Sequence, residues 1–292
     1  MPKFLNSTIG VTGASGHLGR RVIELLREAG AKHIVALTRD PAKLPGVDGI
    51  EVRAVSFDQP TGEIAAAFAG IERLLIISTD AVDTRAAQHR SAVDAAQAAG
   101  VSHVVYTGLT SPYPDATNPI ADSHFWTETR LAESSLNWSI LRNNQYTDYL
   151  LPGAQHAIAT GTLFHAAADG RRAFVTRNDC AAAAVAALLD ADGRRIYDIG
   201  GAEALSGDDL ALLYGRISGR PVTAVSVPAT GLIEGLVQGG VPQGFAQVLA
   251  RFDTDTAKGY LGIVSGHFAE LVGRSPETAA DFLARNQTAL AA

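Results

Sequence analysis

The segment from Gly10 to Gly19 joins an apolar run to a helical pattern through closely spaced glycines. Gly13, Gly16 and Gly19 let the backbone turn sharply, approach a ligand without an intervening Cβ, and pack a helix close on its strand. Free N–H groups at the start of such a helix bind phosphates. The segment predicts a dinucleotide site, with candidate contacts from Thr12, Gly13, Ser15, Gly16, His17, Leu18 and Gly19.

The residues on either side of the glycines support this interpretation. Three spaced glycines alone arise by chance, because the chain holds 29 glycines among 292 residues. Here, however, residues 7–11 form a short apolar strand pattern, and Gly30 follows the expected helix as a C-terminal cap. One helical face carries the apolar residues Leu18, Val22, Leu25, Leu26 and Ala29. A strand, turn and helix without a ligand is the alternative.

The end of the second expected strand, residues 33–38, indicates which nicotinamide cofactor binds. NAD-specific sites place an acidic residue there, whereas this chain has Arg39. A guanidinium pairs with a 2′-phosphate but accepts no proton from a ribose hydroxyl, which favours NADPH. Lys43 would add a second positive charge, and Asp40 leaves NADH use open. Either cation could instead be a solvated surface charge.

The order of elements predicts an α/β fold. Further strands are expected at residues 50–57, 73–79, 102–107 and 138–142, with helices at 63–69, 84–99 and 122–135. Such alternation gives a Rossmann-type, doubly wound parallel sheet whose ligands bind at the carboxyl ends of the strands.

Beyond residue 146 the alternation becomes less regular. Helices are expected at 180–189, 207–217, 229–238 and 276–289, and a strand near 196–200 returns to the sheet. We expect an NADP(H)-binding Rossmann domain over 1–152 and a smaller C-terminal substrate-binding lobe over 153–292.

Composition excludes several classes of protein and site. A net charge of −6 offers no basic face for nucleic acid, and Cys180 is the single cysteine, so no internal disulfide or cysteine-based metal site forms. The histidines lack metal-ligand spacing. No window reaches the ~18 to 20 apolar residues of a membrane span. With no signal-peptide pattern at the N-terminus, we expect a cytoplasmic protein without a metal.

The proton donor common in carbonyl reductases is absent. Those enzymes use a Tyr-x-x-x-Lys pair, but this helix reads from His124 to Glu128 as His-Phe-Trp-Thr-Glu. Without that pair, the favoured substrates are electron-poor acceptors such as quinones and conjugated dyes, whose reduced anions are delocalised.

Several short motifs along the chain form a recognisable set. They lie at 12–19, 39–43, 74–78, 98–101 with 106–107, 141–146, 176–179 and 197–199. Together they resemble the NmrA-like atypical short-chain dehydrogenases. The similarity is greatest to type 2 NAD(P)H:quinone oxidoreductases, triphenylmethane reductases and flavin-free azoreductases.

This resemblance implies NADPH without flavin and a small, flat aromatic acceptor. It places Ser78 and Thr79 along the cofactor, and Asn143 near the nicotinamide. Asn144 and Gln145 depart from the family pattern, which often has glycine and an aromatic residue there, so acceptor preference is open.

Three side chains are candidates for catalysis. Asn143 could hold the nicotinamide carboxamide or the acceptor carbonyl; otherwise it is a turn residue. Tyr146 could line the acceptor site or lend a proton, or lie in the core. His124, with a pKa near neutrality, could protonate the reduced acceptor, or be a solvated helix residue paired with Glu128.

Three functions follow as alternatives. The first is an NADPH-dependent reductase that passes hydride to a quinone, and the second reduces azo or triphenylmethane dyes. The third is an NADP(H)-binding redox sensor without turnover. A homodimer is among the assemblies that the sequence leaves open.

Overall fold

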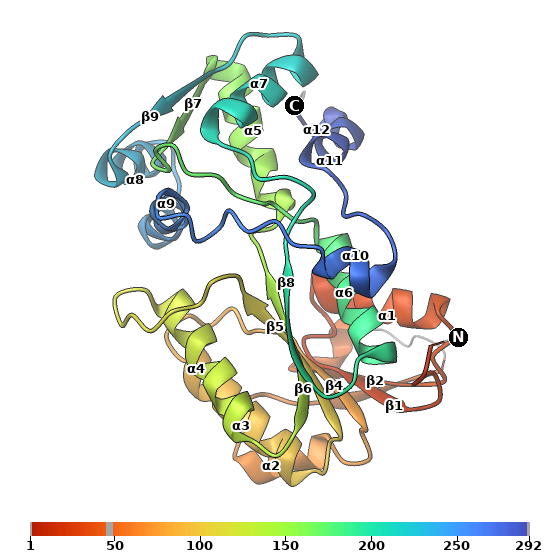
Figure 1. The fold of residues 1–292 in the computed structure, drawn as a ribbon. Coiled ribbons are helices and arrows are strands. Elements are labelled where there is room, and N and C mark those ends of the chain that lie inside the picture. The colour runs from red at the N-terminus through yellow and green to blue at the C-terminus, as the bar shows by residue number, and fades with distance from the viewer. Residues whose placement is uncertain (1, 45–48, 291–292) are drawn as a thin grey trace. The chain divides into compact units, whose positions relative to one another are not determined.

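The computed structural model describes residues 2–44 and 49–290 (Figure 1). The chain divides into two compact units, and it passes between them several times. The first unit comprises residues 1–143, 178–197 and 267–273, and the second 144–177, 198–266 and 274–292. The expected boundary lay at 152, whereas the first change of unit follows Asn143, the last residue of a strand.

The first unit is built on a seven-stranded sheet of order β3-β2-β1-β4-β5-β6-β8. The pairings from β3 through β6 are parallel. The strands are β1 (Thr8–Val11), β2 (His33–Thr38), β3 (Ile50–Ala54), β4 (Arg73–Ile76), β5 (His103–Leu109), β6 (Asn137–Asn143) and β8 (Arg194–Ile199). The predicted Rossmann-type α/β fold is confirmed, including the strand that returns near 196–200.

Helices cover both faces of this sheet (Figure 1). They are α1 (His17–Glu28), α2 (Thr61–Ala67), α3 (Arg85–Ala98), α4 (Pro119–Glu133), α6 (Arg177–Asp190) and α10 (His267–Val272). A buried apolar core joins one sheet face to α2, α3 and α4, and includes Ile64, Phe68, Val93, Leu74, Val104 and Leu131. Burying such side chains contributes roughly 1.5–3 kcal/mol each, so this core holds the strand ends in place.

Two boundaries differ from the prediction for identifiable reasons. α4 begins at Pro119 instead of 122, because the Asn118 side chain accepts the Ala121 N–H at 3.4 Å and proline suits the first helical turn. β4 ends at Ile76 instead of 79, because the backbone N–H groups of the next two residues donate to side-chain hydroxyls and not to the backbone of a neighbouring strand.

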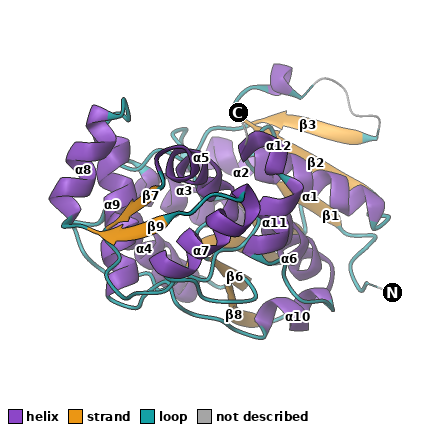
Figure 2. Cartoon of the chain, turned by 90° about the horizontal axis from the view of Figure 1, so that it is seen from above, coloured by secondary structure: helices purple, strands orange, loops and turns teal. Residues whose placement is uncertain are grey.

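The second unit combines a small parallel sheet with helices. β7 (Thr162–His165) pairs with β9 (Thr223–Ser226), as Figure 2 shows. The helices are α5 (Leu150–Thr160), α7 (Gly207–Ser218), α8 (Ala229–Gln238), α9 (Gln243–Ala257), α11 (Ala279–Arg285) and α12 (Gln287–Leu290), preceded by the short helix η2 (Thr147–Tyr149). The single helix expected at 276–289 is therefore two helices. They separate at Asn286, whose side-chain amide donates to the Phe282 carbonyl at 2.7 Å.

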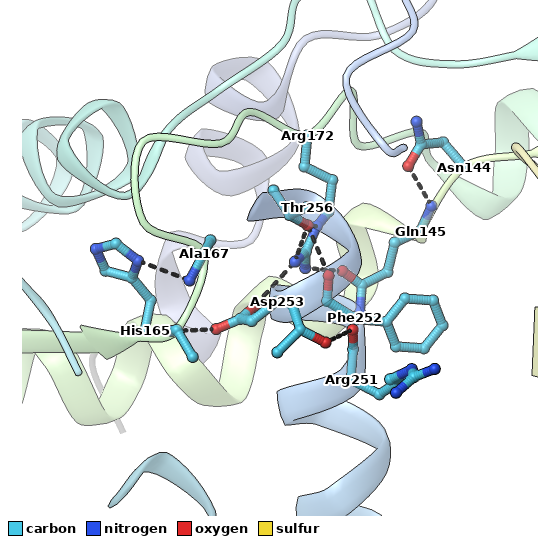
Figure 3. Close-up of polar contacts among 11 residues, drawn as sticks. Asn144, Gln145, His165, Ala167, Arg172, Arg251, Phe252, Asp253 and Thr256 are labelled. Carbon is cyan, nitrogen blue, oxygen red and sulfur yellow. Dashed lines mark hydrogen bonds and ion pairs between the residues drawn. The ribbon is translucent and has the colours of Figure 1, made fainter. Parts of the chain in front are cut away.

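A buried arginine organises the interior of the second unit (Figure 3). The Arg172 guanidinium donates to Asp253 Oδ1 at 2.9 Å and to Thr256 Oγ1 at 2.8 Å, and it also binds Gln145 Oε1. A buried charge is tolerated only with such partners. The network therefore fixes the segment that follows β6 against α9.

Within the described residues, no helix has both the length and the apolar character that crossing a bilayer requires.

Two glycines between β1 and the first turn of α1 occupy positions that disfavour a side chain. Gly13 has a φ of +61°, which favours glycine. A Cβ on Gly19 would lie 2.3 Å from the Gly13 carbonyl oxygen, far inside contact distance. By contrast, a Cβ on Gly62, in α2, would meet nothing within 4 Å.

We therefore expect Gly19→Ala to lower the free energy of unfolding by about 1–3 kcal/mol, the range for overpacking, because backbone must shift. The control Gly62→Ala should leave it unchanged or raise it by up to ~1 kcal/mol, since alanine restricts the unfolded chain. Urea denaturation followed by circular dichroism measures both. Equal effects of the two substitutions would contradict the proposed close approach.

Candidate functional site

The glycine-rich turn presents a bare helix N-terminus. α1 begins at His17, its N-terminal cap Gly16 supplies no side-chain hydrogen bond, and its first turn holds no acidic residue. The first N–H groups of a helix have no partner inside the helix and favour anions. His17 is exposed, whereas Leu18 is buried and can reach a ligand only through its backbone. This end of α1 fits a pyrophosphate.

The expected 2′-phosphate site carries two exposed cations. The Arg39 guanidinium lies 3.7 Å from the Asp80 carboxylate, and the Lys43 ammonium lies 3.9 Å from Asp40. Exposed pairs at such distances contribute little, so both cations can rearrange toward a phosphate.

Arg20, which the sequence analysis missed, ties this region to the glycine-rich turn. It donates to the Ser15 carbonyl at 2.9 Å and to the Lys43 carbonyl at 2.6 Å. Ser15 itself bonds Thr38, with 2.9 Å between the hydroxyl oxygens. The only pattern that could have revealed Arg20 is its place one turn after Gly16.

The loop after β4 is held by side chains from three neighbouring elements. Ile77 N–H donates to Thr12 Oγ1 at 3.0 Å, and Ser78 N–H to Thr107 Oγ1 at 2.9 Å. Thr79 N–H donates to His89 Nε2 at 3.0 Å. The Thr12 hydroxyl thus holds the loop that contains two of the predicted cofactor contacts, Ser78 and Thr79.

Asn143 ends β6 with an unsatisfied amide. Its side chain is 4% exposed, and among the described residues neither Oδ1 nor Nδ2 has a hydrogen-bond partner. The Thr79 hydroxyl, after β4, is buried without a partner in the same way. Each unsatisfied buried group costs about 1–3 kcal/mol, so a ligand that supplied the missing hydrogen bonds would be stabilised here. Both residues fit contacts to a bound nicotinamide.

His124 lies in a buried polar cluster formed by side chains of α3, β5 and α4. Its Nδ1 is 2.6 Å from Tyr106 Oη, which also lies 3.3 Å from His89 Nδ1. His89 Nδ1 is 2.9 Å from Thr127 Oγ1. The sequence analysis missed Tyr106 and His89, because buried strand and helix patterns do not distinguish a polar cluster from core.

The environment corrects two expectations about His124. Burial, and secondarily the positive charge of Arg85, lowers the pKa of His124 well below its usual value, so a pKa near neutrality is wrong. Pairing with Glu128 is also wrong, because Glu128 accepts two hydrogen bonds from Arg142, at 2.9 and 2.6 Å. Burial likewise raises the pKa of Tyr106. A catalytic role for His124 stays a prediction, now for a neutral ring.

Tyr146 belongs to an aromatic surface of the second unit. Its ring stacks on Tyr149, with centroids 6.1 Å apart and planes 12° apart. The Arg177 guanidinium lies 5.1 and 5.4 Å from the two centroids and pairs with Asp148 at 2.7 Å. Since Tyr149 is 48% exposed, the pair offers a flat aromatic face.

The two residues that depart from the family pattern turn inward. Asn144 Nδ2 donates to the Leu261 carbonyl at 2.9 Å, and Gln145 Oε1 binds the buried Arg172. Their side chains serve the interior of the second unit and are not free to contact an acceptor.

The part of the chain that the structure describes contains no group of three or more His, Cys, Asp or Glu that could hold a metal.

The buried histidines make stability depend on pH. Burial and neighbouring arginines lower the pKa of His89 to about 3 and of His103 to about 4, against roughly 6.5 in an unfolded chain. Below that value the unfolded state binds protons that the folded state does not. Stability should therefore be level above pH ~6.5 and fall by up to ~1.4 kcal/mol per pH unit for each such histidine below it. Urea denaturation at pH 8, 7 and 5.5 tests this, and equal stability at 7 and 5.5 would contradict buried neutral rings.

The sequence is similar to known families and proteins that bind nicotinamide cofactors. The family profile described as NAD(P)H-binding matches residues 13–191. Quinone oxidoreductase 2 of Escherichia coli is 36% identical over 281 residues, 94% of this chain and 96% of that protein. The NAD(P)H azoreductase of Xenophilus azovorans is 26% identical, over 97% of this chain and 99% of its own.

Solved structures agree with these matches. The E. coli NADPH-dependent quinone oxidoreductase, complexed with NADPH, superposes with a TM-score of 0.90 at 35% identity, covering 96% of this chain and 99% of that one. The triphenylmethane reductase of Citrobacter, complexed with NADP(H), gives 0.86 at 30% identity, with 95% and 99% covered. The predicted resemblance is confirmed, and the chain belongs to the NAD(P)H-binding, NmrA-like family.

Proposed function

We propose that this protein is an NADPH-dependent, flavin-free reductase that passes hydride to a quinone or a similar conjugated aromatic acceptor. The observation that carries the proposal is the unsatisfied, buried amide of Asn143 at the carboxyl end of β6. This amide and the uncapped N-terminus of α1 lie in the same compact unit. One Rossmann domain therefore carries both a candidate phosphate site and an unpaired amide. The similarity to quinone oxidoreductase 2 supports the same assignment.

Each residue group then has a distinct task. The N-terminus of α1 binds the pyrophosphate, and Arg39 with Lys43 binds the 2′-phosphate. The Asn143 amide holds the nicotinamide carboxamide or the acceptor carbonyl, and the Thr79 hydroxyl adds a contact beside it. Bound NADPH supplies the hydride. Fixing donor and acceptor at contact distance is the main contribution of the protein, since a misplaced group costs much of the rate.

The protonation chemistry limits the acceptor. His124 occupies the helix where carbonyl reductases with the Tyr-x-x-x-Lys pair carry tyrosine, but as a buried neutral ring it is a poor acid. Acceptors that delocalise the charge they gain are therefore preferred, and water completes the protonation.

A dye reductase is the second candidate, because the chain is also similar to an azoreductase and a triphenylmethane reductase. Azo and triphenylmethane dyes are flat, conjugated acceptors of the same kind.

Purified protein should oxidise NADPH when mixed with a benzoquinone or an azo dye and no added flavin, measured as loss of the NADPH absorbance. Comparing the two acceptors separates the two candidates. Flavin released in stoichiometric amount on denaturation would refute the flavin-free assignment. No rate above the uncatalysed one with any acceptor would overturn the proposal and favour an NADP(H)-binding sensor.

Asn143→Ala should lower turnover of the preferred acceptor about ten-fold or more, because it removes a positioning amide, with little change in melting temperature. Asn137→Ala, at the exposed start of the same strand, is the matched control and should leave turnover unchanged. Parental turnover in Asn143→Ala would remove this amide from the mechanism.

Arg39→Ala should weaken NADPH binding by roughly 1.5–3 kcal/mol, the range for hydrogen bonds to charged groups, and leave NADH binding nearly unchanged. Arg90→Ala, an exposed arginine on α3, controls for net charge. Titration calorimetry with both cofactors measures the difference. Equal losses for NADPH and NADH would show that Arg39 does not read the 2′-phosphate.

A further inference from the structure

A chain of hydrogen bonds runs from the loop after β4 to α4. It begins at the backbone of Thr79, whose N–H lies 3.0 Å from His89 Nε2. An amide nitrogen only donates, so His89 Nε2 must accept. A neutral imidazole carries a single proton, which in His89 is therefore on Nδ1.

The next contact uses that proton. His89 Nδ1 lies 2.9 Å from Thr127 Oγ1, and the Thr127 hydroxyl itself donates to the Ser123 carbonyl at 2.6 Å. Thr127 is therefore the acceptor for His89. Tyr106 Oη, 3.3 Å from the same nitrogen, receives at most a weaker share of this bond.

The last contact joins Tyr106 to His124 over 2.6 Å. Donation by O–H gives shorter contacts than donation by N–H, and an imidazole nitrogen is a better acceptor than a phenol oxygen. The phenol of Tyr106 thus donates to His124 Nδ1, and the ring proton of His124 is left on Nε2.

We propose that Tyr106 is a positioning residue that fixes His124 as a neutral imidazole with its proton on Nε2, ready to donate a hydrogen bond to the acceptor atom that gains negative charge. This inference rests on the proposed function. In the reaction, the quinone takes a hydride from NADPH and becomes the hydroquinone anion, while NADPH becomes NADP⁺. The Nε2–H group stabilises the anion without transferring its proton, and water supplies the proton that completes the hydroquinone.

The charged neighbours keep the ring neutral. From α3, Arg85 donates to the Thr79 carbonyl at 2.7 Å and opposes a positive charge on either histidine. From α4, Glu128 is already neutralised by Arg142 of β6. No neighbouring carboxylate among these groups is therefore left to stabilise an imidazolium.

The direct test is the tautomer of His124 in the intact, ¹⁵N-labelled protein. Long-range ¹H–¹⁵N NMR distinguishes protonated from unprotonated ring nitrogens, and His124→Gln assigns the resonances. We expect a protonated Nε2 and an unprotonated Nδ1, unchanged between pH 6 and 8. A proton on Nδ1, or titration within this range, would overturn the proposal.

Tyr106→Phe tests the positioning role, because it removes the donor to Nδ1 and keeps the ring. We expect His124 to become a mixture of tautomers, kcat to fall about ten-fold, and the KM for NADPH to stay unchanged. Ser139→Ala is the matched control: it removes the partner of the buried His103, 3.0 Å away on the same pair of strands, and should change neither readout.

The two failures are distinguishable. If wild-type protein oxidises NADPH with quinone but Tyr106→Phe keeps the single tautomer and full kcat, the positioning role is wrong and the reductase assignment stands. If wild-type protein shows no oxidation with any acceptor, the proposed function fails, whatever the tautomer of His124.

Discussion

Three consecutive backbone N–H groups, those of Ile77, Ser78 and Thr79, leave the sheet after β4, and each is bound by a side chain. The partners are Thr12, directly after β1, Thr107 of β5 and His89 of α3. These donors are only partly buried, but a donor that loses water without gaining a partner costs up to about 1–3 kcal/mol, so three such bonds in a row favour one conformation of this loop. The relation of the glycine-rich turn on one side to Asn143 on the other depends on that conformation.

The same contacts couple the cofactor edge to the interior. His89 holds the loop through one nitrogen, and the other faces the buried hydroxyls of Thr127 and Tyr106. A substitution in this interior cluster is therefore expected to change the hydrogen bond between His89 and the loop. Hydrogen bonds in a low-dielectric interior are stronger than in water, and an incomplete network is correspondingly expensive.

Sequence patterns predicted the Rossmann sheet well because each unit of it is local. Gly13, Gly16 and Gly19 lie close together in the sequence, and β2 is a continuous apolar run that matches its predicted bounds, His33–Thr38. The state of His124 was not accessible in this way. It depends on burial, on the charge of Arg85 and on the contact with Tyr106, which lies 18 residues away on a different element, and no periodic pattern reports such surroundings. Asn144 and Gln145 were unpredictable for the same reason, since Leu261 and Arg172 are distant in the chain.

The passage of the chain between its units has a consequence for how the protein is made. β6 pairs with β8, and the helix α6 precedes that strand, so the first unit needs residues 178–197 and 267–273 in addition to 1–143. During synthesis, β6 remains an open edge until Ile199 has left the ribosome, and open edges pair with other chains. Because each unit is made of three separate segments of the chain, no single truncation yields either unit complete. A single junction in the gene therefore cannot exchange one unit for another domain while keeping the other unit whole.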